Sequence, residues 1–356
     1  MKKLLSVILA SLICLGVLPF SVFATGEKDE SYPVENHFSQ KGSHEVSTVI
    51  YDSGEKDYKH YKIWYPSDLE TSTDTYPVIV YCNGTGCTYD TAEVKSTLEH
   101  FTSWGFVVVS NDHKNSGNGD SASKGLDFLL GLNENSDSLF YQKINIKAIG
   151  INGHSQGGSA TINAASTGKY ENSGIFKSLC AVSAPHSELA ASAWQKTPYD
   201  ASKVEIPSFL VGGTGDIDAG TKTSSGICPL GMGLITNMKA INNETVIIGR
   251  IKDSDHGNTL PLGAAYITAW FYWTLLGDSL AETAFIGENA EIFANEKWQD
   301  VYNKQSENLP ENPDPYDPEA VAETPFNKLV AKIGKILVKI KNCFAGIAEF
   351  FKSLFR

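Results

Sequence analysis

Short apolar runs alternate with segments of helical periodicity along most of this chain. The strand-like runs are Val46–Tyr51, Tyr58–Tyr65, Val78–Cys82, Phe106–Ser110, Ile146–Asn152, Leu179–Ser183, Ser208–Gly212 and Thr245–Ile251. The helical patterns lie at about 91–103, 121–132, 156–166, 229–240 and 262–276. Continuous apolar strands that alternate with helices predict a parallel sheet covered on both faces. The first two runs have no helix between them and predict an antiparallel pair at the sheet edge. The predicted fold class is therefore α/β, with a mostly parallel eight-stranded sheet flanked by helices.

The segment Gly153-His154-Ser155-Gln156-Gly157 follows a predicted strand and precedes a predicted helix. In this context the G-x-S-x-G pattern is typical of a nucleophile elbow. The turn is so tight that side chains on Gly153 and Gly157 would clash, and it raises the serine hydroxyl at the positive end of the helix. An ordinary glycine–serine turn is the alternative. We predict that Ser155 is a nucleophile.

A serine hydroxyl becomes a good nucleophile when a base takes its proton, and after such an elbow the partners follow in the order Ser, Asp, His. The run Ile206–Gly215 is predicted to be a buried strand that ends in a glycine-rich turn and presents Asp216. We predict Asp216 as the orienting carboxylate, and Asp218 is the rival candidate. His256 lies in a loop past the strand Thr245–Ile251, ahead of a helix, and we predict it as the general base.

Acyl transfer also needs preorganised donors for the negative oxygen of the tetrahedral intermediate. One donor is expected from the backbone N–H of Gln156, which directly follows the predicted nucleophile. The second is expected from the loop after the third strand, Val78–Cys82, where the backbone N–H of Thr85 is the candidate. A simple glycine turn is the alternative for this loop.

Several segments together carry a family resemblance: Tyr76–Gly84, Gly105–Val109, Gly153–Gly158, Ile206–Asp216, Asp255-His256, Ala269–Phe271, Gly277-Asp278 and Phe285–Gly287. On these segments the chain resembles the dienelactone hydrolase, chlorophyllase and bacterial cutinase branch of the α/β-hydrolases, which includes polyester hydrolases. The resemblance runs from about residue 44 to residue 304, and we expect the catalytic domain to span residues 44–306. It implies an α/β-hydrolase fold, a triad of Ser155, Asp216 and His256, and an oxyanion hole from Thr85 and Gln156.

The chain departs from the polyester hydrolases at three positions. Thr85 stands where that group usually has an aromatic residue, Gln156 where it commonly has Met, and His186 where it has Trp. The predicted floor of the site is therefore more polar than one that grips an aromatic polyester. His186 is a candidate for binding an acyl or alcohol group, and a solvated loop histidine is the alternative.

The N-terminal residues have the pattern of a signal peptide, with Lys2 and Lys3 before an apolar run and Ala24 at a plausible cleavage point. We predict a signal peptide at residues 1–24 and a secreted or extracellular location. Residues 25–43 are polar and are expected to form a loose arm.

Residues 307–325 are rich in proline and acidic side chains and hold no basic one, so we predict an extended, solvated linker. In residues 326–356 apolar residues recur at intervals of three and four. Lysines repeat on a different face of this predicted C-terminal amphipathic helix: Lys328, Lys332, Lys335 and Lys339. The pattern predicts a helix that binds a membrane surface and could retain the protein at the cell surface. The alternative is that the helix packs on the acidic domain.

The net charge of −12 is concentrated in the body, because both ends are basic. An acidic body argues against nucleic acid as a partner. No Cys-x-x-Cys or His-x-x-x-His spacing suggests a metal site, and we expect no cofactor. Export would permit a disulfide, for which Cys87 with Cys228 is the candidate pair.

The leading functional prediction is an esterase that hydrolyses carboxylic esters of small-molecule, lipid or polymer type through an acyl-serine intermediate. An acyltransferase with the same triad, in which an alcohol takes the acyl group, is one alternative. The other is a catalytically silent binding protein presented on the cell envelope. A binding protein has no need of Ser, Asp and His together, which favours an enzyme.

Overall fold

Nine strands form one sheet in the part of the chain that the structure, a computed structural model, describes, namely residues 31–193 and 195–322. They are β1 (Val46–Asp52), β2 (His60–Pro66), β3 (Tyr76–Cys82), β4 (Val107–Asn111), β5 (Ile144–His154), β6 (Ser178–Val182), β7 (Ser208–Gly213), β8 (Val246–Ile251) and β9 (Trp298–Asn303). Their order across the sheet is β1-β2-β4-β3-β5-β6-β7-β8-β9.

The pairing from β4 to β8 is parallel throughout, and the antiparallel pairs are β1 with β2, β2 with β4, and β8 with β9. All eight predicted strands are present, and the predicted mostly parallel sheet is confirmed. The prediction missed β9. This edge strand is only partly buried beyond Trp298, so its sequence lacks the continuous apolar run by which the central strands were found.

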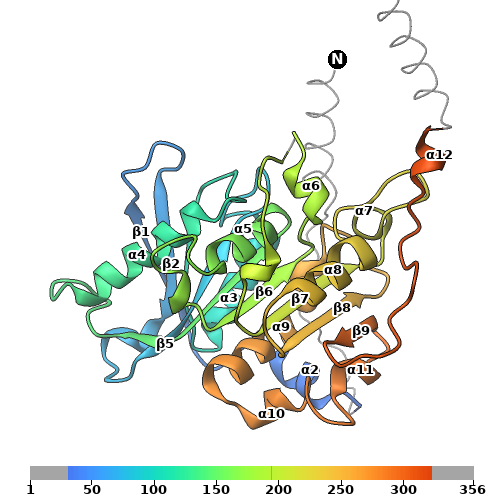
Figure 1. Ribbon diagram of the computed structural model, residues 1–356. Helices are drawn as coiled ribbons and strands as arrows, with labels where there is room; N and C mark the ends of the chain where they lie inside the picture. The colour runs from blue at the N-terminus through green and yellow to red at the C-terminus, as the bar shows by residue number, and fades with distance from the viewer. Residues whose placement is uncertain (1–30, 194, 323–356) are drawn as a thin grey trace, which may run out of the picture.

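Helices cover both faces of the sheet (Figure 1). One face packs against α4 (Asp120–Glu134), α5 (Gln156–Ala165), the π-helix η4 (Leu230–Ile235) and α8 (Thr236–Ala240). The other packs against α2 (Pro33–Phe38), α3 (Ala92–Ser103), α9 (Thr259–Leu276), α10 (Ser279–Glu282) and α11 (Glu291–Ala294). Shorter elements lie in the connections: η1 (Ser67–Glu70), η2 (Ser173–Ile175), η3 (Ala201–Lys203), α6 (Ser187–Ala191), α7 (Asp216–Ala219) and α12 (Pro318–Ala322).

The strand order reverses at β3. The chain moves from β3 through α3 to β4 on one side, and then through α4 to β5 on the other side of β3. In open α/β sheets a crevice for ligands forms beyond the carboxyl ends of the strands near such a reversal. The loops that follow β3, β5, β7 and β8 meet at this end of the sheet, which positions the site described below.

The N-terminal arm is more ordered than predicted. Its residues Pro33–Phe38 form α2, and the Val34 and Phe38 side chains are fully buried against α9. The buried carboxylate of Glu291 accepts hydrogen bonds from the backbone N–H groups of Val34 at 2.7 Å and Glu35 at 2.8 Å. The expectation of a loose arm over residues 25–43 is therefore wrong for this part. The prediction rested on the polar composition of the segment. It did not take account of the apolar residues Val34 and Phe38, or of the helix cap that Glu291 supplies from far along the chain.

The segment that we predicted to be a linker is attached to the domain. Both carboxylate oxygens of Asp314 accept hydrogen bonds at the start of η4, from the backbone N–H of Gly231 at 2.7 Å and of Met232 at 2.8 Å. The short helix α12 also lies in this segment, so the prediction of an extended chain is wrong for residues 318–322. The predicted signal peptide and C-terminal amphipathic helix lie outside the described residues.

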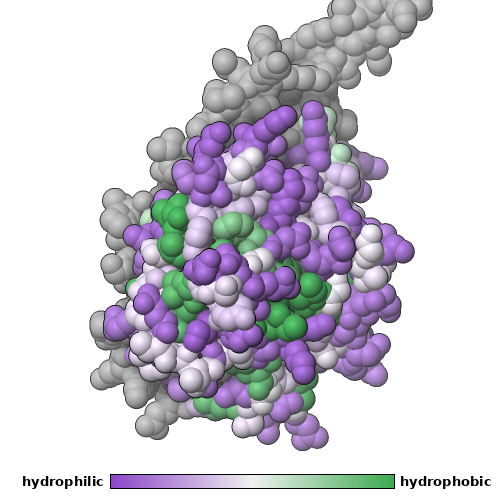
Figure 2. Space-filling view, turned by 90° about the vertical axis from the view of Figure 1, so that its left-hand side faces the viewer, coloured by the Kyte–Doolittle hydropathy of each residue, from purple (hydrophilic) through white to green (hydrophobic). Residues whose placement is uncertain are grey.

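The side of the molecule that faces left in Figure 1, where β1 forms the sheet edge, is mostly hydrophilic (Figure 2). Apolar residues on it lie in separate patches between polar ones. Among the described residues, no helix combines the length and the apolar character that crossing a bilayer requires.

Cys228 is buried with a free thiol next to β7, its Sγ 3.9 Å from the Val211 carbonyl oxygen, so the candidate Cys87–Cys228 disulfide is wrong.

Candidate active site

Ser155 lies at the tight turn between β5 and α5, as the sequence predicts. Its φ of 59° is in the left-handed region, which a non-glycine residue rarely adopts and which indicates local strain. A Cβ atom on Gly153 would overlap the Gly157 carbonyl oxygen, and one on Gly157 would overlap the carbonyl oxygen of Cys82. Only glycine fits at these two positions, so the predicted reason for the flanking glycines is confirmed.

The ring of His256 lies between Ser155 and a buried carboxylate. Its Nε2 is 2.9 Å from the Ser155 Oγ, and its Nδ1 is 2.7 Å from Oδ1 of Asp218. With a carboxylate at Nδ1, that nitrogen donates its proton, and Nε2 is then the acceptor for the serine hydroxyl. The His256 side chain is only 1% exposed. The structure therefore brings the predicted serine and histidine together in the geometry of a nucleophile and its base.

The carboxylate at His256 belongs to Asp218, so the prediction of Asp216 was wrong and the rival candidate takes its place. Asp216 begins the short helix α7 and is exposed to solvent, whereas Asp218 is 0% exposed. Oδ2 of Asp218 accepts hydrogen bonds from Ser183 Oγ at 2.5 Å and from the Gly213 backbone N–H at 2.8 Å. These donors lie at the ends of β6 and β7 and direct the carboxylate inward.

Two opposing effects act on the pKa of Asp218. Burial raises it, but the attraction of His256 and the hydrogen bonds from His256, Ser183 and Gly213 outweigh burial and leave the pKa below its ordinary value. Asp218 is thus held as an anion next to the imidazole. An anion there favours the Nδ1–H tautomer and stabilises the imidazolium that forms when His256 takes a proton.

Asp255, which the sequence analysis did not single out as a site residue, connects the acid and the base. Its Oδ1 accepts hydrogen bonds from the backbone N–H of Asp218 at 3.1 Å and of His256 at 2.8 Å. The backbone N–H of Ile217 is also 3.1 Å from this oxygen. One carboxylate therefore joins the loop after β8 to the start of α7. Its position next to His256 was visible in the sequence, but nothing there indicated the contact with α7.

His154 is a second residue whose role was not predicted. Its ring lies against that of His256, with centroids 4.7 Å apart, and its Nε2 is 2.7 Å from the His256 carbonyl oxygen. Because the carbonyl can only accept, Nε2 carries a proton and donates. Burial, followed by the nearby His256, lowers the pKa of His154 to about 3. His154 is therefore neutral, and its hydrogen bond helps to hold the backbone of the loop that carries His256.

The two predicted oxyanion donors line the same pocket, and one of them, Gln156, directly follows Ser155 in the chain. Gln156 is the first residue of α5, where backbone N–H groups have no partner within the helix. Thr85 follows Gly84, on which a Cβ would be only 3.2 Å from the Cβ of Ser155. The loop after β3 thus approaches Ser155 closely, as the prediction of a second donor from Thr85 requires.

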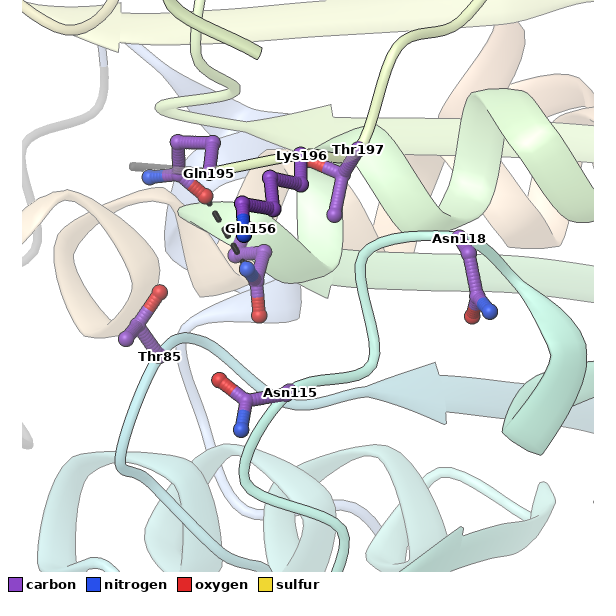
Figure 3. A pocket seen from close by; sticks show the side chains of 7 residues that line it. All are labelled: Thr85, Asn115, Asn118, Gln156, Gln195, Lys196 and Thr197. Carbon is purple, nitrogen blue, oxygen red and sulfur yellow. Dashed lines mark hydrogen bonds between the residues drawn. The ribbon is translucent and has the colours of Figure 1, made fainter. Parts of the chain in front are cut away.

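The pocket itself has a volume of about 300 Å³ and draws residues from four segments (Figure 3). They are the loop after β3, the loop between β4 and α4, the start of α5 and the segment that follows α6. We call it the polar pocket, and its lining residues are Thr85, Asn115, Asn118, Gln156, Gln195, Lys196 and Thr197. Only Thr85 and Gln156 had been predicted as site residues, because isolated polar residues in loops give no signal in a sequence.

His186 does not line the polar pocket. It precedes α6, is 3% exposed, and its Nε2 is 3.1 Å from the Ser225 Oγ. Its backbone N–H donates to the Ile227 carbonyl oxygen at 2.8 Å. The ring thus supports the 225–227 segment, and the burial that this requires lowers the pKa of His186. The ring is buried, so the alternative of a solvated loop histidine is wrong, and a role of His186 in substrate binding stays a prediction.

The described part of the chain holds no group of three or more His, Cys, Asp or Glu side chains placed to bind a metal ion. The polar groups that surround Ser155 are instead the histidine, carboxylate and backbone amides described above.

The sequence model of a family described as PETase, PET hydrolase-like, matches residues 33–240 of this chain, which is more than half of its 356 residues. The match contains Thr85, Ser155 and Asp218, and His256 lies beyond its end. No curated protein shows a significant match. Together with the sheet topology, the family match confirms the predicted α/β-hydrolase fold, the resemblance to polyester hydrolases and, in general terms, a carboxylic ester hydrolase.

Proposed function

The chain belongs to the PET hydrolase-like family, and from this premise we propose that it is a secreted serine esterase that cleaves carboxylic esters through an acyl-Ser155 intermediate. The observation that carries the proposal is the continuous contact from Asp218 through His256 to Ser155, at 2.7 Å and 2.9 Å. These distances lie within the reach that proton transfer requires.

In the first half of the reaction, His256 Nε2 takes the proton of the Ser155 hydroxyl as its oxygen attacks the ester carbonyl. The imidazolium forms beside the Asp218 anion, which offsets its charge. His256 then gives the proton to the leaving alcohol, and the acyl group remains on Ser155. In the second half, His256 removes a proton from water, the hydroxide attacks the acyl carbonyl, and Ser155 recovers its proton as the acid leaves.

Both tetrahedral intermediates carry a negative oxygen. The backbone N–H groups of Gln156 and Thr85 are the donors that we assign to it, because both residues line the polar pocket next to Ser155. The N-terminal end of α5 adds a favourable dipole at the same point. Removing one such donor typically raises the barrier by ~3–4 kcal/mol.

Active-site labelling tests this proposal. A fluorophosphonate probe should modify the wild-type protein at Ser155 and leave Ser155→Ala unmodified, and the same substitution should abolish hydrolysis of 4-nitrophenyl acetate. Equal labelling of both proteins, with the probe on another residue, would rule out Ser155 as the nucleophile.

The proposed export rests on the sequence pattern of residues 1–24. We also propose that residues 326–356 bind a membrane surface, since their apolar residues and lysines repeat on different faces of a helical pattern. Both segments lie outside the described residues.

A further inference from the structure

Every lining residue of the polar pocket has a polar side chain. A site that binds aromatic or aliphatic groups is lined mainly by apolar and aromatic side chains, with a few polar groups for orientation. Here the proportion is reversed directly beside the nucleophile, because Gln156 and Thr85 belong to the lining. The portion of a substrate that occupies this pocket must therefore face amides, hydroxyls and the Lys196 ammonium group.

Three polar atoms of the lining have no hydrogen-bond partner among the described residues: Thr85 Oγ1, Gln156 Oε1 and Thr197 Oγ1. All three are buried. Figure 3 shows the Gln156 amide oxygen pointing into the space between Thr85 and Asn115, while its Nε2 is held by Gln195 Oε1 at 3.0 Å. That bond fixes which end of the Gln156 amide faces the pocket. The free end is an acceptor, and the two threonine hydroxyls can donate or accept.

A glycine brings two of these groups together. A Cβ on Gly117 would lie 2.5 Å from the Gln156 Cγ and 2.5 Å from the Thr197 Cγ2. Because Gly117 has no side chain, the loop after β4 can pack closely against Gln156 and Thr197 at this point. Asn163 Nδ2 donates to the Gly117 carbonyl oxygen at 2.8 Å and keeps the loop in place. The unpaired groups are thus positioned by close packing of the surrounding loops.

Buried polar groups without partners determine which ligand is favoured. An aromatic ring in this pocket would keep each of them unpaired, and a buried polar group without a partner makes binding less favourable. Hydroxyl groups act as both donor and acceptor, and they can satisfy amide oxygens and threonine hydroxyls alike. The polar lining continues past Asn115 into a second hollow at His113 and Lys114, where His113 Nδ1 is also buried without a partner among the described residues.

We propose that the polar pocket binds a portion of the substrate that carries several hydroxyl groups, as in a sugar or a cyclic polyol, so that the preferred substrates are esters of such compounds. This inference rests on the proposed esterase function. The hydroxyl-bearing portion can be the alcohol or the acid of the ester, and the experiment distinguishes the two.

Two matched pairs of esters provide the test. Methyl 6-O-acetyl-glucopyranoside and cyclohexylmethyl acetate share an acyl group and differ in the hydroxyls of the alcohol. Methyl quinate and methyl cyclohexanecarboxylate differ in the hydroxyls of the acid. For at least one pair, we expect kcat/KM of the mature wild-type enzyme to be at least ~10-fold higher for the hydroxylated ester, because a site built for hydrogen bonds rejects the analogue that lacks them. Equal or lower values for both hydroxylated esters would overturn the proposal.

Two near-isosteric substitutions examine the pocket itself. Asn115→Leu and Thr197→Val each remove hydrogen-bonding atoms from the lining and keep much of the volume. We expect each to lower the preference within the favoured pair by ~5-fold or more, mainly by raising KM for the hydroxylated ester. Thr167→Val is the matched control, since Thr167 is exposed and lines a different hollow. An unchanged preference in both folded pocket variants would contradict the assignment. The wild-type comparison keeps the test valid if a variant fails to fold.

The two hypotheses fail in different ways. If the enzyme hydrolyses 4-nitrophenyl acetate through Ser155 but prefers the apolar member of each pair, the proposed esterase function stands. The proposal that the polar pocket binds hydroxyl groups is then wrong. A protein that hydrolyses no ester and is not labelled at Ser155 overturns the proposed function, and the substrate inference falls with it.

Discussion

The side-chain carboxylate of Asp255 accepts a hydrogen bond from the backbone N–H of Asp218 at 3.1 Å. The same oxygen accepts one from the backbone N–H of His256 at 2.8 Å. This side chain therefore helps to hold the loop that carries Asp218 against the loop that carries His256, beside the hydrogen bonds from the Gly215 N–H to the Ser254 carbonyl oxygen and from the Asp253 N–H to Thr214 Oγ1. Since Asp255 touches neither Ser155 nor the polar pocket, it is a positioning residue.

Asp255→Ala should lower kcat by about 10–100-fold, because displacement of reacting groups by about 1 Å can cost two orders of magnitude in rate. KM should change little. Asp255→Asn keeps one oxygen acceptor for these N–H groups and should recover much of kcat. The check is steady-state hydrolysis of 4-nitrophenyl acetate over pH 5–9. If Asp255→Ala melts at a lower temperature but retains full kcat, the residue acts in stability alone.

Asp218→Asn should reduce kcat by about 10⁴-fold, because an amide at this position favours the wrong tautomer of the histidine. Asp216→Asn should remain within about twofold of wild type, since Asp216 is exposed and, of these two aspartates, it is Asp218 that contacts the His256 ring. The two variants have the same change in composition and charge, so each is the control for the other. The reverse ranking would restore Asp216 as the acid.

The low pKa of His154 predicts a pH dependence of stability. An unfolded chain binds a proton at this histidine below pH ~6.5, whereas the folded protein resists it down to a pKa of about 3. The free energy of unfolding should therefore decrease as the pH falls from ~6.5, with a contribution from His154 of up to ~1.4 kcal/mol per pH unit. His154→Gln should flatten this slope while its amide still donates to the His256 carbonyl.

Urea unfolding of both proteins between pH 7.5 and pH 4 measures this effect. At pH 7.5 the difference between them reports lost contacts alone, because both side chains are then neutral. If the difference in free energy of unfolding between wild type and variant stays constant down to pH 4, His154 is not the cause of the pH dependence of stability.

Deletion of the predicted tail should separate membrane binding from catalysis. The mature chain stopped at Thr324 should keep the melting temperature and the turnover of soluble esters, and it should no longer bind anionic liposomes. Each Lys near an anionic surface contributes ~1 kcal/mol, weakened by salt. Replacing Lys328, Lys332, Lys335 and Lys339 with Gln in the full chain should weaken binding and reduce its salt dependence. A truncated protein that melts several degrees lower would indicate that the tail packs on the domain.

The central part of the fold was predictable because burial on both faces produces continuous apolar runs, and all eight such runs form strands. The missed elements have weaker local signals. Strand β9 mixes polar and apolar residues and is only partly buried beyond Trp298, and α2 is short, with its cap supplied by Glu291 from the other end of the domain. The attachment of the linker depends in the same way on Asp314 reaching η4. Contacts between distant segments leave no periodic pattern in either of them.

The amino-acid sequence by itself pointed to Ser155 and His256, which the structure brings together. Ser155 lies in the tight turn that its flanking glycines predict, because a Cβ atom on Gly153 or on Gly157 would overlap backbone atoms. The sequence also limited the acid to Asp216 or Asp218. The tertiary structure decided between them, because residues two apart in a helical turn lie about 200° apart around its axis, and the docking of α7 turned only Asp218 inward. The polar pocket likewise depends on the tertiary structure. Its lining residues come from four segments that lie far apart in the sequence, and the sequence of each segment alone does not show that they meet.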